Sequence, residues 1–310
     1  MTVPVFQAGM GGGIAGAGLA AAVSEAGGLG TLGIMPPPRL ARELTRAREL
    51  TGRPLAINLL LPFTRDEHWD VAREADAVVT FWGRPVRRTA RVWIHQCGSV
   101  AEAHAAHVAG ADAVIAQGVE AGGHVRGTLP ASRLLEQVCS ALPGYPVLVA
   151  GGVATAADVR AARDAGAAGV VAGTRFLLSD ESAAHPGYKR RLLESDRTLL
   201  TELFGFGWPA RHRVVANAAT DRWVGGDGRT PALVRLTHRA AAPLLTRLSP
   251  STGARLAAHQ RVAVPLFGPS APLAGSPPGM VEVAPLYAGE TVARIGELRP
   301  AGELVQDLTP

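Results

Sequence analysis

Residues 145–178 contain the feature that most limits how this chain can fold: two short apolar runs, each ended by a glycine turn, with a helical stretch between them. The turns are Gly151-Gly152 and Gly173-Thr174. The helix is expected to begin after Thr155, because this residue and Asp158 can accept hydrogen bonds from the unpaired N–H groups of a helix start. The order strand, helix, strand predicts two parallel strands whose glycine turns lie at the same edge of the sheet.

Two such turns side by side favour the binding of an anion. Glycine has no Cβ atom, so a phosphate group can closely approach the main-chain N–H groups of Gly151, Gly152 and Gly173. In eight-stranded β/α barrels, the loops after the seventh and eighth strands commonly hold a phosphate. The plainer alternative is that these glycines only make tight turns. We favour a phosphate site because both turns are glycine-rich and lie one βα unit apart.

The first part of the chain repeats the same alternation. Eight short apolar strands are predicted, most of them separated by helical segments. This pattern indicates an α/β fold, a closed (β/α)8 TIM barrel. The strands are expected at residues 3–8, 30–34, 55–61, 76–81, 92–96, 112–117, 146–150 and 168–172.

A dinucleotide-binding fold is the main alternative for the first strand and its turn. Gly11, Gly13 and Gly16 fit the pattern G-x-G-x-x-G. That fingerprint also needs an acidic residue at the end of the second strand to bind a ribose. Here the second strand runs into the sequence MPPP, residues 35–38, without a carboxylate. The barrel is therefore the better interpretation.

The alternation does not continue to the end of the chain, which predicts three segments. Residues 1–189 are expected to form the barrel, and residues 190–270 a smaller, mostly helical inserted domain that covers the active site. Within the insert, helices are predicted at residues 192–204 and 233–248. Residues 271–310 are expected to return to the barrel and to pack a C-terminal helix on it.

Composition argues against several classes of function. The formal net charge of +5 comes from arginines scattered among acidic residues, a pattern that does not favour nucleic-acid binding. The glycine-rich N-terminal region also contains Ser24 and Glu25, so no membrane span is expected there. Two cysteines are too few for a disulfide framework, so a reducing cytoplasm is expected. His104 and His107 have no cysteine or carboxylate cluster beside them, so no metal is expected.

Polar residues at the carboxyl ends of strands are the candidates for chemistry, because the reactive groups of β/α barrels come from there. Asn58 and Gln117 each close an apolar strand, and an amide can both donate and accept hydrogen bonds to a ring with carbonyls and nitrogens. Hydration of a strand end is an equal alternative for either residue alone. Cys97 follows the fifth strand without a cationic neighbour in the sequence and is interpreted as a packing residue.

His124 stands in the loop after the sixth predicted strand, directly behind two glycines. The main chain can bend there and aim the imidazole into the mouth of the barrel. An unperturbed pKa near 6.5 allows a histidine to act as a base or as a donor near neutrality. A surface histidine is the alternative, but the position next to the predicted phosphate turns favours a catalytic role.

Seven stretches that lie along nearly the whole chain read QAGMGGGIAGAGLAAAVSEAGGLGTLG, AINLLLP, AQGVEAGGH, PVLVAGGVATAADV, AGVVAGTRF, ESAAHPGYK and PLYAGETVARI. Together they resemble the nitronate monooxygenase (2-nitropropane dioxygenase-like) family of flavin-dependent β/α barrels. The chain departs from many of these relatives at Gly9, where they have a proline. The short leader that precedes the first strand in such relatives is expected to be missing.

The resemblance implies bound FMN, with the phosphate at Gly151-Gly152 and Gly173-Thr174. It also implies that His124 is the active-site histidine and that the insert covers the flavin. The residues implied to bind the cofactor are Ala8, Gly9, Met10, Asn58, Gln117, Gly122, Gly123, Ala150, Gly151, Gly152, Gly173 and Thr174.

The activity implied by the resemblance is the FMN-dependent oxidation of alkyl nitronates, or of nitroalkanes, with O2 to a carbonyl compound and nitrite. His124 would take the α-proton of a neutral nitroalkane or hydrogen-bond an anionic nitronate, and the second role needs a cationic or donor histidine. One alternative is an FMN-dependent reductase of the same superfamily that uses NAD(P)H on an enoyl thioester or a quinone. Another is a non-catalytic protein that binds flavin or a partner. The expected partners are a small-molecule substrate and O2, with a homodimer left open.

Overall fold

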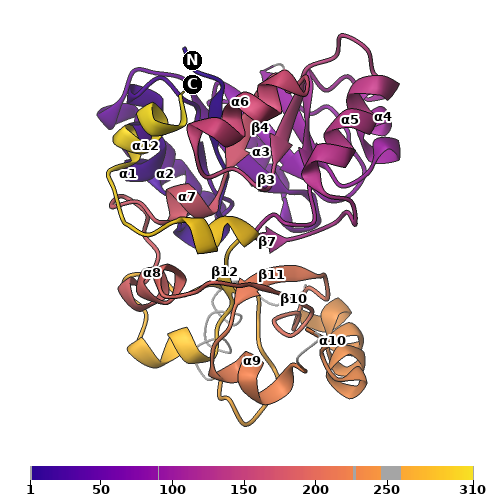
Figure 1. Ribbon diagram of the computed structural model, residues 1–310, viewed down its shortest axis with the longest axis vertical. Helices are drawn as coiled ribbons and strands as arrows, with labels where there is room; N and C mark the ends of the chain where they lie inside the picture. Colours follow the sequence, from indigo (N-terminus) through magenta and orange to yellow (C-terminus); the bar gives the residue numbers. More distant parts are fainter. Residues whose placement is uncertain (1, 90, 226–227, 246–259, 310) are drawn as a thin grey trace.

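The computed structural model describes residues 2–89, 91–225, 228–245 and 260–309. The chain forms a (β/α)8 TIM barrel, which confirms the predicted fold class. A smaller lobe lies against one end of the barrel, and the first and last described residues lie at the opposite end (Figure 1).

Eight parallel strands make the barrel, each within two residues of its predicted bounds. They are ordered β1-β9-β8-β6-β5-β4-β3-β2. The barrel closes where Phe6 pairs with Leu29 and the Gln7 N–H donates to the Leu29 carbonyl at 3.0 Å. The strands are β1 (Val5–Gln7), β2 (Gly30–Leu32), β3 (Leu55–Leu60), β4 (Ala77–Phe81), β5 (Val92–Cys97), β6 (Ala113–Gln117), β8 (Val147–Ala150) and β9 (Gly169–Ala172).

Helices cover the outside of the barrel, except between β4 and β5, where the described residues form no helix. The start of α6 is the predicted one: the Thr155 hydroxyl accepts from the Asp158 N–H at 3.3 Å, and the Asp158 carboxylate accepts from the Thr155 N–H at 2.9 Å. The helices of the barrel are α1 (Ala17–Glu25), α2 (Pro37–Leu50), α3 (Asp66–Ala72), α4 (Val100–Val108), α5 (Ala131–Ala141), α6 (Ala156–Asp164), α7 (Thr174–Leu177) and α12 (Ala301–Leu308). Helix α8 (Pro186–Leu193) lies beside the smaller lobe (Figure 1).

The C-terminal helix packs on the barrel beside the first helix. Leu304 and Val305 of α12 are fully buried in one apolar cluster with Leu19 and Val23 of α1. The barrel interior is filled by a separate cluster of mainly small and branched side chains. These are Phe6, Leu29, Ala56, Ala77, Val79, Ile94, Ile115, Leu148, Ala150 and Val171. Because this cluster fills the barrel, the space for a ligand lies at the carboxyl ends of the strands.

The smaller lobe is built on a short antiparallel sheet. Its central strand is β11 (His212–Val215), with β10 (Leu199–Thr201) along one edge. The other edge of β11 pairs with β12 (Leu286–Tyr287) and with β7 (Gly123–His124). Thus the loop that contains His124 leaves the barrel and joins the sheet of the smaller lobe.

The helix predicted at residues 192–204 is wrong. Helix α8 ends at Leu193, and residues 199–201 form β10, in which Leu199 pairs with Val214 and Thr201 with His212. The leucine spacing of this stretch suits a helix locally, but pairing with a distant strand outweighs a local preference. Two further helices of the lobe are α9 (Ala218–Trp223) and α10 (Ala232–Leu245). Helix α10 matches most of the helix predicted at 233–248, whose last three residues lie outside the described part.

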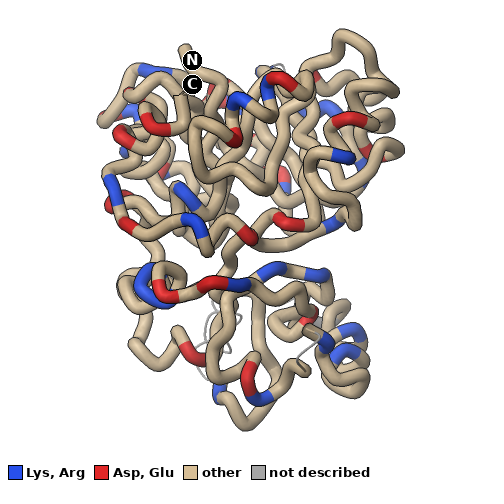
Figure 2. Tube along the Cα trace, viewed as in Figure 1, with Lys and Arg blue, Asp and Glu red and all other residues tan. Residues whose placement is uncertain are grey.

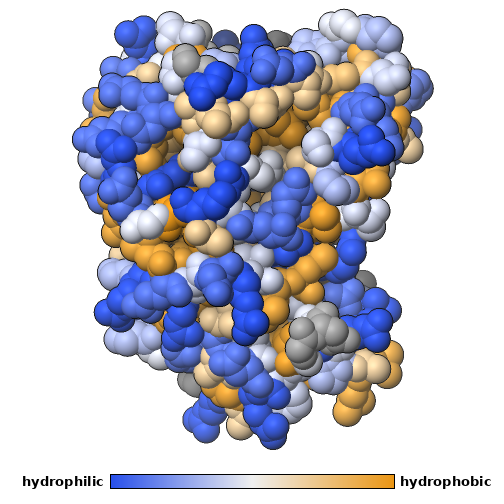
Figure 3. All heavy atoms as spheres, viewed as in Figure 1, coloured by the Kyte–Doolittle hydropathy of each residue, from blue (hydrophilic) through white to orange (hydrophobic). Residues whose placement is uncertain are grey.

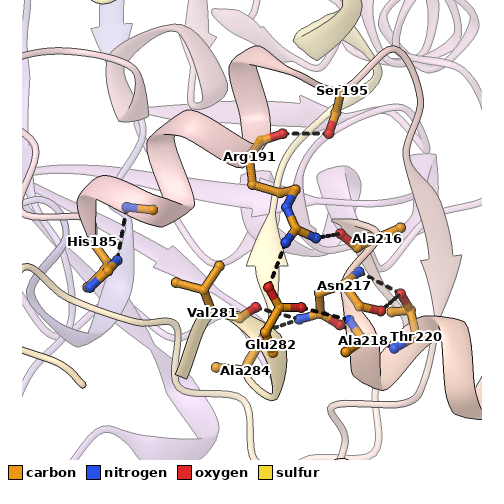
Figure 4. Close-up of polar contacts among 11 residues, drawn as sticks. His185, Arg191, Ser195, Ala216, Asn217, Ala218, Thr220, Val281, Glu282 and Ala284 are labelled. Carbon is orange, nitrogen blue, oxygen red and sulfur yellow. Dashed lines mark hydrogen bonds and ion pairs between the residues drawn. The ribbon is translucent and has the colours of Figure 1, made fainter. Parts of the chain in front are cut away.

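A polar cluster joins α8 to α9 and to the return segment (Figure 4). The Arg191 guanidinium forms an ion pair with Glu282 at 2.6 Å and donates to the Ala216 carbonyl at 3.2 Å. The Asn217 amide donates to the carbonyls of Val281 and Ala284 at 2.9 and 2.8 Å. Glu282 lies in the short helix η3 (Pro278–Glu282), so this cluster fixes the return segment to the smaller lobe.

Charges of both signs are interspersed along the trace of both lobes (Figure 2). Hydrophilic residues cover most of the face shown in Figure 3, with hydrophobic ones in smaller patches between them. None of the described helices is both long enough and apolar enough to cross a membrane.

Candidate active site

A cavity of about 380 Å³ lies at the carboxyl ends of the barrel strands, between the barrel and the smaller lobe. Its size falls in the range of small-molecule and cofactor sites. The lining includes His124 and all twelve residues implied by the resemblance to bind a cofactor. Those twelve are Ala8, Gly9, Met10, Asn58, Gln117, Gly122, Gly123, Ala150, Gly151, Gly152, Gly173 and Thr174.

Two glycine turns form one wall of the cavity, behind β8 and β9. Gly151 and Gly152 have φ values of 111° and 77°, a left-handed conformation that glycine adopts without strain. A Cβ atom on Gly152 would meet no atom closer than 3.8 Å, so the space in front of this residue is open. Within the described part of the chain, no hydrogen bond uses the N–H groups of Gly151, Gly152 or Gly173. These donors are available to an anion.

Charged groups surround the first of these turns. The Arg294 guanidinium donates to the Gly152 carbonyl at 2.8 Å and pairs with Asp158 at 2.9 Å. On the other side, the Glu120 carboxylate accepts from the Ala131 N–H at 2.9 Å, while its second oxygen is buried without a partner. The turn therefore has a cation behind it and an acidic side chain beside it.

Asn58, in the second half of β3, lies against Gly9. The Asn58 side-chain amide donates to the Val79 carbonyl at 3.3 Å. A Cβ atom on Gly9 would lie 2.2 Å from the Asn58 Cβ, a distance that two carbon atoms cannot share. The position of Asn58 thus requires glycine at residue 9 of this chain.

Gln117, at the end of β6, braces the strand that contains His124. Its amide nitrogen donates to the His124 carbonyl at 3.0 Å, and its oxygen accepts from the Arg126 N–H at 3.4 Å. The side chain is buried, with 4% of its surface exposed. The nitrogen and the oxygen of this amide therefore hold the main chain on the two sides of Val125. Gln117 also lines the cavity.

The smaller lobe fixes the same loop from above. His212 of β11 pairs with His124, and the Val125 N–H donates to the Arg211 carbonyl at 2.9 Å. The Arg213 guanidinium donates twice to the Val119 carbonyl, at 3.0 and 2.8 Å. Three consecutive residues of the lobe thus hold the loop that positions His124.

The His124 ring lies among aromatic rings. Its face is stacked on Trp208, with centroids 3.7 Å apart and an angle of 21° between the planes. The rings of His212 and Tyr287 lie at 5.3 and 5.4 Å. Nε2 of His124 is buried without a hydrogen-bond partner in the described part of the chain. His124 lines the cavity, and no hydrogen bond within the described part of the chain occupies this nitrogen.

Burial keeps His124 neutral. Removal of the ring from water, and secondly the neighbouring His212, hold the pKa of His124 well below its usual value of 6.5. Burial also lowers the pKa of His212 to about 4. Near neutral pH the His124 ring can therefore accept a proton at one nitrogen and donate a hydrogen bond from the other.

Two aromatic side chains of the cavity lining, Trp208 and Phe63, were not among the residues singled out from the sequence. Trp208 comes from the smaller lobe and Phe63 from the short helix η2 (Leu61–Phe63), and their rings pack edge to face at 5.1 Å. Trp82, just outside the lining, packs on Trp208 at 5.3 Å. No sequence signal marks Trp208, because its place depends on the packing of two lobes.

Tyr287 and the segment 269–271, called the covering segment below, line the cavity on the side of the return segment. The Tyr287 hydroxyl donates to the Pro269 carbonyl at 2.8 Å, and the Tyr188 hydroxyl donates to the Tyr287 carbonyl at 2.6 Å. Pro269, Ser270 and Ala271 all line the cavity. The Tyr287 hydroxyl therefore holds this segment at Pro269, next to Gly268, whose N–H donates to the Gln260 side chain at 2.7 Å.

Other residues considered at the sequence level lie elsewhere. Cys97 is buried, burial raises the pKa of its thiol to about 12, and the thiol donates weakly to the Ile115 carbonyl at 3.4 Å. This agrees with its interpretation as a packing residue. His104 is exposed on α4, and His107 of the same helix packs edge-on against Tyr145 at 4.6 Å.

Comparison with known proteins relates this architecture to one family and to its neighbours. A family model described as nitronate monooxygenase matches residues 1–92 and 85–310. A probable nitronate monooxygenase of Bacillus subtilis is 32% identical over a match that spans 66% of this chain and 74% of that protein.

Two further relatives have other names. The (3aS,4S,5R,7aS)-5-hydroxy-7a-methyl-1-oxo-octahydro-1H-indene-4-carboxyl-CoA dehydrogenase of Mycobacterium tuberculosis is 35% identical over 72% of this chain. The match spans 66% of that dehydrogenase, just under two thirds of its length. The solved structure of FabK from Thermotoga maritima superposes with a TM-score of 0.77 at 27% identity, covering 99% of this chain and 92% of that one.

Proposed function

Since the chain belongs to the nitronate monooxygenase family and is thus an oxidoreductase, we propose that it oxidises alkyl nitronates with O2 to a carbonyl compound and nitrite, using bound FMN. The observation that carries this proposal is the cavity itself, in which unpaired N–H groups of two glycine turns and a buried imidazole face the same space. The name of the Bacillus subtilis relative supports the same substrate class.

The residues of the cavity fit FMN. A phosphate would accept hydrogen bonds from the N–H groups of Gly151, Gly152 and Gly173, with Arg294 behind the first turn. The amides of Asn58 and Gln117 would lie beside the flavin ring, which has carbonyls and ring nitrogens to match them. Bound FMN would supply the redox chemistry, taking up electrons from the substrate and passing them to O2.

His124 would act on the proton and on the charge of the substrate. With a neutral nitroalkane, the C–H bond at the α-carbon breaks, the proton goes to the unprotonated nitrogen of the His124 imidazole, and the electron pair remains on the nitronate. With a preformed nitronate no proton is transferred, and the imidazole N–H would donate to a nitro oxygen. Because burial opposes a charge on this ring, a neutral donor fits the site better than a cationic one.

The aromatic walls would orient the substrate and keep water away from it. Trp208, Phe63 and Tyr287 line the cavity together with His124, and the covering segment lines it as well. An electrostatic interaction with the nitro group is stronger in such a dry site than in water.

A second candidate is an FMN-dependent reductase that uses NAD(P)H on an enoyl thioester or a quinone. The superposition on FabK, which belongs to the enoyl reductases, and the identity with the CoA dehydrogenase favour it. Both activities would use the same cavity, so the electron donor distinguishes them.

Anaerobic mixing tests the two candidates. The flavin-loaded protein is mixed without O2 with ethyl nitronate, with propionate 3-nitronate, with NADH and with NADPH, and the visible flavin absorbance is followed. Our proposal predicts a rapid loss of absorbance with a nitronate, and nitrite after admission of air. Rapid loss with NADH or NADPH alone would favour the reductase. A flavin that responds to none of the four would contradict both and favour a non-catalytic role.

The remaining expectations are part of the same proposal. O2 would be the second substrate, the protein would act in the cytoplasm, as the low cysteine content suggests, and a homodimer is left open. Consumption of one O2 per nitrite, or of none, would decide the first of these.

A further inference from the structure

The ring of His124 is held by stacking, whereas a catalytic histidine is commonly oriented by a hydrogen bond to its ring. In the described part of the chain, no hydrogen bond joins the His124 ring to another protein group. The one close contact on its face is the indole of Trp208, with centroids 3.7 Å apart and planes at 21°. The orientation of the imidazole therefore depends on this contact.

Trp208 is itself held firmly. The main-chain N–H of Trp208 donates to the Gly205 carbonyl at 3.0 Å, and the Trp208 carbonyl accepts from the Ala210 N–H at 2.8 Å. The edges of Phe63 and Trp82 pack on the indole at 5.1 and 5.3 Å, with interplanar angles of 76° and 73°. Contacts on two sides leave the indole face presented to His124.

The same stack affects the charge of the histidine. The face of an aromatic ring attracts a cation, and tryptophan does so most strongly. The titratable groups packed against His124 are His212 of β11 and Tyr287 of β12, and Glu120 lines the same cavity. His212 is neutral, since its Nδ1 lies 2.9 Å from the Ala210 carbonyl and its Nε2 accepts from the Phe204 N–H at 3.2 Å. Neither His212 nor Tyr287 offers His124 a negative charge.

We propose that Trp208 is a positioning residue for proton abstraction: its indole fixes the plane of His124 and stabilises the imidazolium that forms when His124 takes the α-proton of a nitroalkane. This inference rests on the proposed function. The proton moves from the α-carbon of the nitroalkane to His124, and the electron pair stays on the nitronate. With a preformed nitronate no imidazolium forms, so Trp208 matters less.

The test compares three variants of the flavin-loaded protein on nitroethane and on its preformed nitronate. Trp208→Leu should lower kcat/KM for nitroethane by about tenfold. It should change the value for the nitronate by less than about twofold, and it should raise the deuterium isotope effect with nitroethane labelled at the α-carbon. Trp208→Phe retains an aromatic face and should restore most of the loss. Phe81→Leu removes another aromatic side chain of the cavity lining, one whose ring contact is with Trp82 and not with Trp208 or His124, and it should change both substrates by a similar factor.

A second readout does not depend on turnover. In protein labelled at histidine Cε1, the His124 resonance should show an upfield ring-current shift in the wild type and in Phe81→Leu. This shift should be lost in Trp208→Leu. The resonance is assigned by its absence in His124→Asn.

Two results would overturn the proposal: an equal loss on both substrates in Trp208→Leu, or a His124 resonance that is the same with and without the indole. If neither nitroethane nor its nitronate is turned over, the proposed function fails. The resonance then still decides whether the stack exists, and a shifted resonance supports the positioning role for whatever proton this histidine exchanges.

Discussion

His124 and the glycines opposite it have separate tasks in the proposed site. The imidazole is neutral because it is buried, so it can take a proton from a substrate. The glycine turns present main-chain donors to an anion and contribute no side chain. Loss of the imidazole should therefore affect turnover without affecting flavin binding, and a side chain on a turn should do the opposite.

Replacement of His124 tests the first of these tasks. His124→Asn should leave the protein yellow and lower kcat/KM for a neutral nitroalkane by about 10² to 10⁴, because it removes the base. The loss on a preformed nitronate should be smaller. Steady-state kinetics on both substrates measure this. His104→Asn removes an exposed histidine from α4 and is the control. Full nitroalkane turnover in His124→Asn would rule out the base role.

Replacement of Gly152 tests the second task. Gly152→Val should yield colourless protein, because the added side chain enters the open space where a phosphate is proposed to bind. Gly144→Val is a matched control, since Gly144 has a φ of 75° against 77° at Gly152, and its Cβ would also meet no atom within 3.8 Å. The left-handed strain is thus the same in both variants. The ratio of flavin to protein absorbance is the measurement, and stoichiometric flavin in Gly152→Val would contradict the phosphate assignment.

At the level of elements, the sheet of the smaller lobe determines where His124 lies. In the pairing of β11 with β7, His212 lies opposite His124. In the pairing of β11 with β12, Val214 lies opposite Tyr287. The lobe is therefore part of the site in addition to covering it. Substitutions in this sheet should therefore change the stability of the protein and the release of its ligand, even at residues that no substrate contacts.

The buried histidine of β11 makes stability depend on pH. The pKa of His212 is about 4 in the folded protein and near 6.5 when unfolded, so the unfolded state binds more protons between these values. The folded state therefore keeps its full stability above pH 6.5 and loses it as the pH falls toward 4. Between pH 7.5 and pH 5, the titration of His212 alone should lower the free energy of unfolding by about 2 kcal/mol.

His212→Asn removes this titration. The difference between the free energies of unfolding at pH 7.5 and pH 5 should shrink by about 2 kcal/mol in the variant, whatever the variant does to stability at either pH. Urea denaturation at the two pH values measures it. An unchanged difference would mean that His212 is not held neutral in the folded protein.

The hydroxyl of Tyr287 should control the release of flavin. Tyr287→Phe breaks the hydrogen bond to the Pro269 carbonyl and leaves the ring in place. One hydrogen bond contributes about 0.5 to 1.5 kcal/mol, so FMN should dissociate about two- to tenfold faster. Tyr188→Phe is the control, because the Tyr188 hydroxyl bonds to the Tyr287 carbonyl and not to the covering segment. The rate of FMN dissociation is measured by stopped flow. Equal rates in the two variants would show that the segment 269–271 does not control the release of flavin.

Across the whole molecule, the barrel could be predicted from the sequence because its signals are local. Apolar runs, glycine turns and the pair Thr155 and Asp158 each lie within a few residues, and all eight strands form where they were predicted. The same locality placed Asn58, Gln117 and His124 at strand ends, and the cavity brings them together.

The parts that escaped prediction depend on distant pairing. The stretch 192–204 has the leucines of a helix, but β10 forms there because β11 lies beside it. Trp208 reaches His124 only because β7 and β11 join the two lobes. No local sequence pattern marks such a residue, so the contact of Trp208 with His124 could be found only in the structure.

The most direct test of the account is a crystal structure of the protein with FMN bound. The account predicts that the phosphate lies within hydrogen-bond distance of the N–H groups of Gly152 and Gly173, and that the flavin ring lies in the cavity facing His124 across the substrate space. A phosphate bound away from both glycine turns, or a flavin ring separated from His124 by the aromatic wall, would contradict it.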